Sequence, residues 1–163
     1  MNTGETDLDR AMKFAGAEAN RVGDVNLLLT PVRTVAVIST AQGMINNGGL
    51  QYLFECDFPH EPPYSIFVDA YHEIGAQDEA NALAAAVKLF PFAEPHKFLE
   101  RRLAFLDQYI AEGDHRSDSP FEPYTNLLCG NENVWRLLEE YVARHAAALR
   151  AYDPEEKTDD GRD

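Results

Sequence analysis

Cysteine is scarce in this sequence, and its scarcity excludes several classes of small protein. The only thiols are Cys56 and Cys129, more than seventy residues apart, and no Cys-x-x-Cys pair occurs. The sequence therefore contains neither a zinc ribbon nor a thioredoxin-type motif. Two separated thiols are typical of a reducing compartment, where cysteine behaves as a small apolar residue, and we expect no disulfide between them.

Long apolar segments are also missing. No run of eighteen apolar residues occurs, so we expect no membrane-spanning helix. The first ten residues, MNTGETDLDR, are polar and acidic, and they lack the basic and apolar regions of a secretory signal. These features predict a cytoplasmic protein that does not associate with membranes.

Positive charge is in short supply. The chain has 28 acidic and 14 basic residues, for a formal net charge of −14. Proteins bind nucleic acids by neutralising phosphates with Lys and Arg, and a field of the opposite sign repels both nucleic acids and anionic membranes. Partners that are recruited electrostatically should therefore be basic proteins. The alternative interpretation is that the negative charge serves only solubility.

Patterns that carry catalysis or hold metals are absent or incomplete. His72 begins a segment like the metalloprotease helix motif, but Ala76 stands where the second histidine is needed. Cys56, Asp57 and His60 have no second ligand pair that would close a four-ligand zinc site. No Gly-x-Ser-x-Gly nucleophile elbow and no phosphate-binding glycine loop occurs. We therefore predict no enzyme, no metal and no cofactor.

Helical periodicity dominates what is present. Apolar residues make up 45% of the chain, which supports a hydrophobic core. They recur at intervals of three and four residues, as on the buried face of a helix. The expected helices cover residues 6–22, 32–45, 64–74, 77–90, 96–112 and 131–152, with one or two further turns at 50–54.

The second of these helices has the clearest boundaries. Thr30 and Pro31 predict its start, as N-cap and first-turn residue. The Asn-Asn-Gly-Gly string at 46–49 predicts its end, because Asn and Gly tolerate the left-handed backbone of a helix C-cap. The β-branched residues from 32 to 40 fit a strand equally well, and the sequence leaves that alternative open.

The C-terminal third is expected to begin with a loop. Residues 114–130 contain Pro120 and Pro123 and are interpreted as irregular. The helix that follows is expected to carry an ion pair between Glu140 and Arg144, which are four residues apart.

Together these segments predict an all-α fold, a compact single-domain array of about six helices with short connections. The domain is expected to span residues 1–152. Residues 153–163 hold six acidic and two basic residues and contain a helix-ending proline, so we expect a disordered acidic tail.

One stretch of the chain lacks cations altogether. Between Thr34 and Val87 there is no Lys or Arg. Within it, Asp69 and Glu73 are four residues apart on one helix, or about 6 Å along the axis. Like charges at this spacing mildly destabilise a helix, so they indicate a surface kept for a partner. The expected partner-binding residues are Glu55, Asp57, Glu61, Asp69, Glu73, Asp78 and Glu79.

A family resemblance adds to this reading. The string INNGGLQYLF at 45–54, taken with residues 64–75 and with KLFP at 88–91, resembles the bacterial DNA-mimic-protein C-terminal-domain family. The resemblance covers about residues 32–112. The sequence departs from the family pattern at Glu55 and Cys56, where family members often have Asn and Ser. The family is known for an acidic helical member that imitates DNA and sequesters a DNA-binding regulator.

The acidic surface and the resemblance predict a protein-binding module. Its leading form is a DNA mimic that occupies the DNA-binding surface of a basic regulator without binding nucleic acid itself. A homodimer is left open. The alternative is an immunity or antitoxin-type protein that blocks a toxin, and the third interpretation is an enzyme or metal protein.

Overall fold

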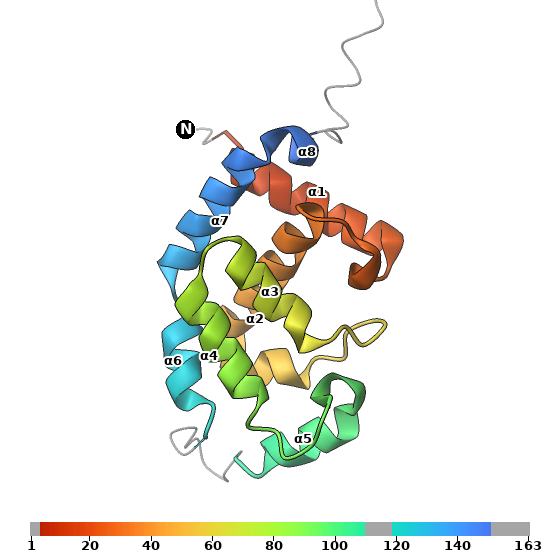
Figure 1. The fold of residues 1–163 in the computed structure, drawn as a ribbon, viewed down its shortest axis with the longest axis vertical. Helices are drawn as coiled ribbons and strands as arrows, with labels where there is room; N and C mark the ends of the chain where they lie inside the picture. Colours follow the sequence, from red (N-terminus) through yellow and green to blue (C-terminus); the bar gives the residue numbers. More distant parts are fainter. Residues whose placement is uncertain (1–3, 110–118, 151–163) are drawn as a thin grey trace, which may run out of the picture.

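The helix α2 (Val32–Glu55) is the central element of the structure, and the other helices surround it (Figure 1). The structure is a computed structural model that describes residues 4–109 and 119–150. The described part contains eight α-helices, two 3-10 helices and no strand, so the predicted all-α fold is confirmed with two helices more than expected. The remaining elements are α1 (Asp7–Val22), η1 (Val25–Leu27), α3 (Tyr64–Glu73), α4 (Gln77–Val87), η2 (Pro95–Lys97), α5 (Leu99–Asp107), α6 (Glu122–Leu128), α7 (Glu132–Arg144) and α8 (Ala146–Arg150).

Burial on nearly every side explains the composition of α2. Val35, Ile38 and Ile45 are fully buried, and the helix packs against α1, α3, α5, α6 and α7. The strand alternative for residues 32–40 is wrong, because tertiary packing on all faces decides the conformation of β-branched residues more strongly than their propensity does. The predicted cap is also wrong: Pro31 precedes the helix, and no side chain caps its start.

Gly49 interrupts α2 where the sequence predicts its end. The backbone at Gly49 has φ 70° and ψ −171°, a conformation that is essentially restricted to glycine. A Cβ atom there would lie 2.9 Å from the Cγ2 atom of Thr125, whose hydroxyl accepts a hydrogen bond from the Leu50 amide at 3.3 Å. The chain then returns to helix as far as Glu55. The predicted end is thus a break between two helical segments, fitted closely against α6.

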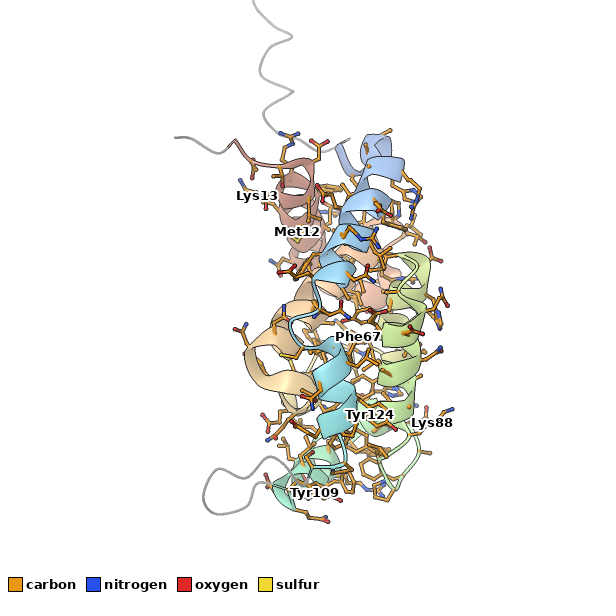
Figure 2. The ribbon with its side chains drawn as sticks, turned by 90° about the vertical axis from the view of Figure 1, so that its left-hand side faces the viewer. Met12, Lys13, Phe67, Lys88, Tyr109 and Tyr124 are labelled. Atoms are coloured by element: carbon orange, nitrogen blue, oxygen red, sulfur yellow. The ribbon has the colours of Figure 1, made fainter. Side chains whose placement is uncertain are left out.

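The helices α3 and α4 form a hairpin that packs on α2 through α3, and both start where the sequence predicts; α4 ends at Val87, before the predicted end at residue 90. Gly75, at φ 89°, makes the turn between them. The Nδ1 atom of His72 lies 2.6 Å from the Oε1 atom of Gln77, which ties the last turn of α3 to the first turn of α4. In Figure 2 the hairpin runs along one side of the molecule, and Lys88 projects from its lower end.

Aromatic rings fill one end of the core. The ring of Phe54 lies 5.2 Å from that of Tyr64, 5.1 Å from that of Phe90 and 5.3 Å from that of Phe121. Edge-on and tilted pairs at such distances are the favourable geometries for aromatic side chains. Trp135, the single tryptophan of the chain, lies on α7 and makes no ring contact with this cluster in the described part of the chain.

The C-terminal third departs from the sequence-based prediction in two respects. The helix α6 lies inside the stretch from 114 to 130 that is predicted to be irregular. Glu140 pairs with Arg136 at 2.5 Å rather than with Arg144, whose guanidinium lies over the ring of Tyr141. The start of the next helix is as predicted, since Asn131 caps α7 by accepting a hydrogen bond from the Asn133 amide.

Two further predictions lie partly or wholly outside the described residues. The helix expected at 96–112 is shorter, because α5 begins at Leu99 after η2 and ends at Asp107; residues 110–112 and the acidic tail at 153–163 lie outside the described residues. In residues 4–109 and 119–150, none of the helices has the length and apolarity that crossing a bilayer requires.

Candidate functional site

The predicted partner-binding residues are spread over the end of α2, the loop before α3, α3 itself and the start of α4. Asp57 and Glu61 are exposed on the loop that leads into the helix. Asp69 and Glu73 are exposed on the helix itself, and Asp78 is exposed in the first turn of α4. Because α3 has ten residues, about 15 Å separates its two ends. The five exposed carboxylates therefore belong to one elongated region and not to one compact cluster.

Two of these carboxylates share a groove between α3 and the start of α2. The groove has a volume of about 220 Å³, and Asp69 and Glu73 both line it. Its buried side is formed by Thr34 and Ala70, which are 2% and 4% exposed. The other lining residues are Thr30, Arg33, Ile66 and His72.

Arg33 changes the expectation of a surface without cations. It stands one residue before the stretch that lacks Lys and Arg, and it lines the same groove as Asp69 and Glu73. The absence of basic residues along the sequence from 34 to 87 therefore does not make the folded surface free of positive charge. Arg33 nevertheless forms no ion pair within 4.0 Å in the described part of the chain.

The exposed carboxylates are likewise left unpaired. Five ion pairs occur within residues 4–109 and 119–150, and none includes a predicted partner-binding residue. Four of the five join residues three or four apart on α1, near η2 or on α7. The five cations that form these ion pairs belong to other elements, so none of them neutralises a carboxylate of α3.

Two of the seven predicted residues differ from the other five. Glu79 is only 5% exposed, and its Oε1 atom accepts a hydrogen bond from the Asn131 amide at 2.8 Å. The interpretation of Glu79 as an exposed surface charge is wrong, because the first turn of α4 packs against the start of α7. Glu55 is half-buried and accepts a hydrogen bond from the Gln51 side chain at 2.6 Å.

The groove is coupled to the core through Tyr141 of α7. Burial raises the pKa of Tyr141, a hydrogen bond with Thr34 lowers it, and the negative charge of Glu73 raises it again. Tyr141 is itself buried, and its hydrogen bond with Thr34 joins α7 to a residue that lines the groove.

The side chains that suggest metal or thiol chemistry are separated in the fold. No group of three His, Cys, Asp or Glu residues in the described ranges is arranged to hold a metal ion. Burial raises the pKa of the half-buried Cys56 thiol, and the neighbouring Asp57 charge adds to the effect. A raised pKa disfavours the thiolate, which is the nucleophilic form. Cys56 and Cys129 are both free thiols.

A buried arginine fixes the start of the acidic loop, and the sequence analysis does not single it out. Arg102 is 2% exposed and bonds four backbone carbonyl groups rather than a carboxylate. Its Nε and Nη2 atoms donate to Phe54 and Cys56 at 2.9 and 3.0 Å, while Nη1 donates to Pro95 and His96. The carbonyls at the end of α2 are negative, as the helix dipole requires, and the guanidinium neutralises them.

The signal for Arg102 is present in the sequence. Leu99, Leu103 and Leu106 form the apolar stripe of α5, and position 102 falls on the same face at the i+3 spacing. A second buried polar group, Gln42, gives no such signal. Its Nε2 atom donates to the Leu128 carbonyl at 2.8 Å, and its Oε1 atom accepts from the Tyr71 hydroxyl at 2.9 Å.

Comparison with known proteins gives one match. The family model described as DMP19-like protein matches residues 26–145, which is more than half of the chain. The match extends beyond residues 32–112 at both ends and includes α6 and α7. No protein with a curated description and no solved structure is significantly similar to the chain.

Proposed function

Because the chain belongs to the DMP19-like family, a family of DNA mimics, we propose that it is an acidic protein-binding module that occupies the DNA-binding surface of a basic regulator. The observation that carries this proposal is the set of exposed carboxylates on α3 and at its two ends, none of which forms an ion pair within residues 4–109 and 119–150. The proposed contact residues are Asp57, Glu61, Asp69, Glu73 and Asp78.

The spacing of the carboxylates supports imitation of a phosphate backbone. Asp69 and Glu73 are about 6 Å apart along the helix axis. Phosphates of one DNA strand rise by 3.4 Å per step along the duplex axis and also turn about it, so neighbouring phosphates lie about 6–7 Å apart through space. Lys and Arg side chains that contact neighbouring phosphates can therefore meet these two carboxylates with little change in position.

The scaffold supports the same role. Carboxylates on a helix that is packed against a buried neighbour hold fixed positions, and a partner that binds them loses less conformational entropy. Arg33 in the groove weakens the local field, although the net charge of −14 keeps the overall attraction toward a basic partner. We propose a binding role for this surface rather than catalysis.

The test is capture of DNA-binding proteins from a native lysate, with duplex DNA as competitor. The variant Asp69→Lys with Glu73→Lys should lose at least tenfold in capture, because two attractive contacts become repulsive. Capture by the unmodified protein should also fall steeply between 50 and 200 mM salt and be displaced by duplex DNA.

The matched control is Glu100→Lys with Asp107→Lys. These two residues are exposed on α5, which lies below α3 at the lower end of Figure 1, and their replacement changes the net charge by the same amount. The control should retain capture. Equal losses of capture in the two variants would show that net charge alone attracts partners. The proposal would be rejected if the variant Asp69→Lys with Glu73→Lys still captured partners at high salt.

A further inference from the structure

Two leucines next to the groove are exposed to an unusual degree. Leu27 is 69% exposed and Leu29 is 81% exposed, whereas Leu28 between them is 5% exposed and belongs to the core. Each of these values is larger than that of any other large apolar side chain that is exposed in the described residues. A single exposed leucine needs no explanation, but two that flank a buried one on a short connection form a small apolar projection.

The projection is held rigidly. Asp24 accepts a hydrogen bond from the Asn26 amide at 2.9 Å, and the amides of Leu27 and Leu28 donate to the carbonyls of Asp24 and Val25. These bonds form η1, and the buried side chain of Leu28 fixes it to the core. Leu27 and Leu29 are therefore presented in set positions, as the anchor residues of a protein interface are.

The projection adjoins the groove of the proposed site. The Leu29 carbonyl accepts a hydrogen bond from the Arg33 amide at 3.0 Å, and Thr30 and Arg33 line the groove with Asp69. The leucines therefore stand beside the groove that Asp69 and Glu73 line.

We infer that Leu27 and Leu29 are apolar anchors for the same basic partner, and that they occupy the apolar side chains with which a regulator contacts thymine methyl groups in DNA. This inference rests on the proposed function. DNA-reading surfaces place apolar side chains beside Lys and Arg, because the thymine methyl lies in the major groove between the phosphate backbones. A mimic with carboxylates alone reproduces the phosphates, and leucine methyl groups beside the carboxylates reproduce the thymine methyl groups.

The two kinds of contact have different signatures. Carboxylates increase the association rate and make affinity depend on salt. Apolar anchors that are buried on binding slow dissociation and act at any salt concentration. Leucine contacts would therefore allow the protein to displace DNA at salt concentrations where charge alone is screened.

The test uses two synthetic probes of equal length and equal positive charge. Both are built from Lys, Arg and Ser, and in one of them two serines are replaced by leucines. The unmodified protein should bind the leucine-containing peptide about tenfold more tightly, with the same salt dependence for both peptides. The variant Leu27→Ser with Leu29→Ser should lose this preference and bind both peptides as the unmodified protein binds the serine peptide.

The matched control is Tyr52→Ser with Leu127→Ser, which removes two exposed apolar side chains from α2 and α6. It should keep the tenfold preference. Retention of the preference in the variant at 27 and 29, or its absence in the unmodified protein, would overturn the inference. So would sedimentation showing that the unmodified protein forms a dimer that only this variant dissolves, because the leucines would then cover a second copy.

The proposed function fails by a different result. If reversal of Asp69 and Glu73 leaves binding of both peptides unchanged, the carboxylates do not attract basic partners. The leucine preference is measured independently as the ratio between the two peptides in one protein. The two failures can therefore be told apart.

Discussion

Arg102 and the carboxylates of the groove show two opposite treatments of charge in one small protein. Arg102 is buried, and four backbone carbonyls surround its guanidinium. Asp69 and Glu73 are exposed and have no ion pair, although Arg33 lines the same groove. The comparison teaches that the buried charge stabilises the fold, whereas the exposed charges contribute little to it and are available to another molecule.

The largest effect is expected where the buried charge is removed. Arg102→Met should lower the free energy of unfolding by about 3–5 kcal/mol, because four carbonyls lose a charged donor and some of them stay buried. Urea unfolding, monitored by circular dichroism, measures this change in the free energy of unfolding. Arg101→Met is the control, since Arg101 is exposed and lies over the Phe92 ring at 4.1 Å, a contact that contributes about 0.5–1 kcal/mol. A loss below 1 kcal/mol at Arg102 would contradict the comparison.

A smaller loss of stability is expected at the break in α2, the helix that packs against both α5, which carries Arg102, and α3, which carries the carboxylates of the groove. Gly49→Ala should cost about 2–3 kcal/mol, because alanine is strained at φ 70° and its Cβ would meet the Thr125 methyl. Gly43→Ala, in the same helix with open space around the new Cβ, should instead stabilise by about 0.5–1 kcal/mol. Thermal melting of the two variants separates the effects, and a neutral result at position 49 would show that the break is not required.

High pH should destabilise the end of the molecule that contains Arg102. Burial raises the pKa of Tyr64 to about 12, and the Arg102 charge opposes this only in part. The folded state then keeps a proton that the unfolded state releases near pH 10, so this contribution to stability is complete below pH 10 and is lost as pH rises from 10 through 12. The expected slope is up to about 1.4 kcal/mol per pH unit in this window.

Tyr64→Phe should flatten that slope, as measured by urea unfolding at pH 9, 10 and 11. Tyr71, whose pKa burial also raises, remains in the variant and maintains part of the dependence. An identical slope in the two proteins would assign the alkaline loss to other groups.

The smallest effect on stability is expected for the carboxylates of the groove. Asp69→Asn with Glu73→Gln should change the free energy of unfolding by no more than a few tenths of a kcal/mol, in the stabilising direction, because it removes repulsion between like charges. Urea unfolding at low salt is the measurement. A loss above 1 kcal/mol would mean that the carboxylates hold the structure together, and the contrast with Arg102 would disappear.

Local patterns predict the helices well in this chain, because capping residues, glycines and apolar periodicity act over a few residues. The hairpin of α3 and α4 is the clearest case, with its turn at Gly75. Ambiguity remains where distant packing decides the outcome. The helix predicted from residue 32 is confirmed, but residues 32–40 also fit a strand by propensity, and only the surrounding helices exclude that alternative.

The site could be predicted from the sequence only in outline. Asp69 and Glu73 share a face because their spacing requires it, and the structure brings both to one groove. Arg33 reaches that groove from another element, and Glu79 is covered by the start of α7, so neither placement follows from local sequence. The exposure of Leu27 and Leu29 is equally hidden, since a leucine triplet in a sequence indicates a core.

The position of Trp135 determines what a fluorescence experiment reports about this protein. The indole lies on α7, and the phenylalanine cluster around Phe54 is built from α2, α3, α5 and the segments beside them. Tryptophan emission therefore follows the surroundings of α7, and the aromatic end of the core contributes no such signal. Emission and helical ellipticity that melt at different temperatures would reveal the two ends opening separately.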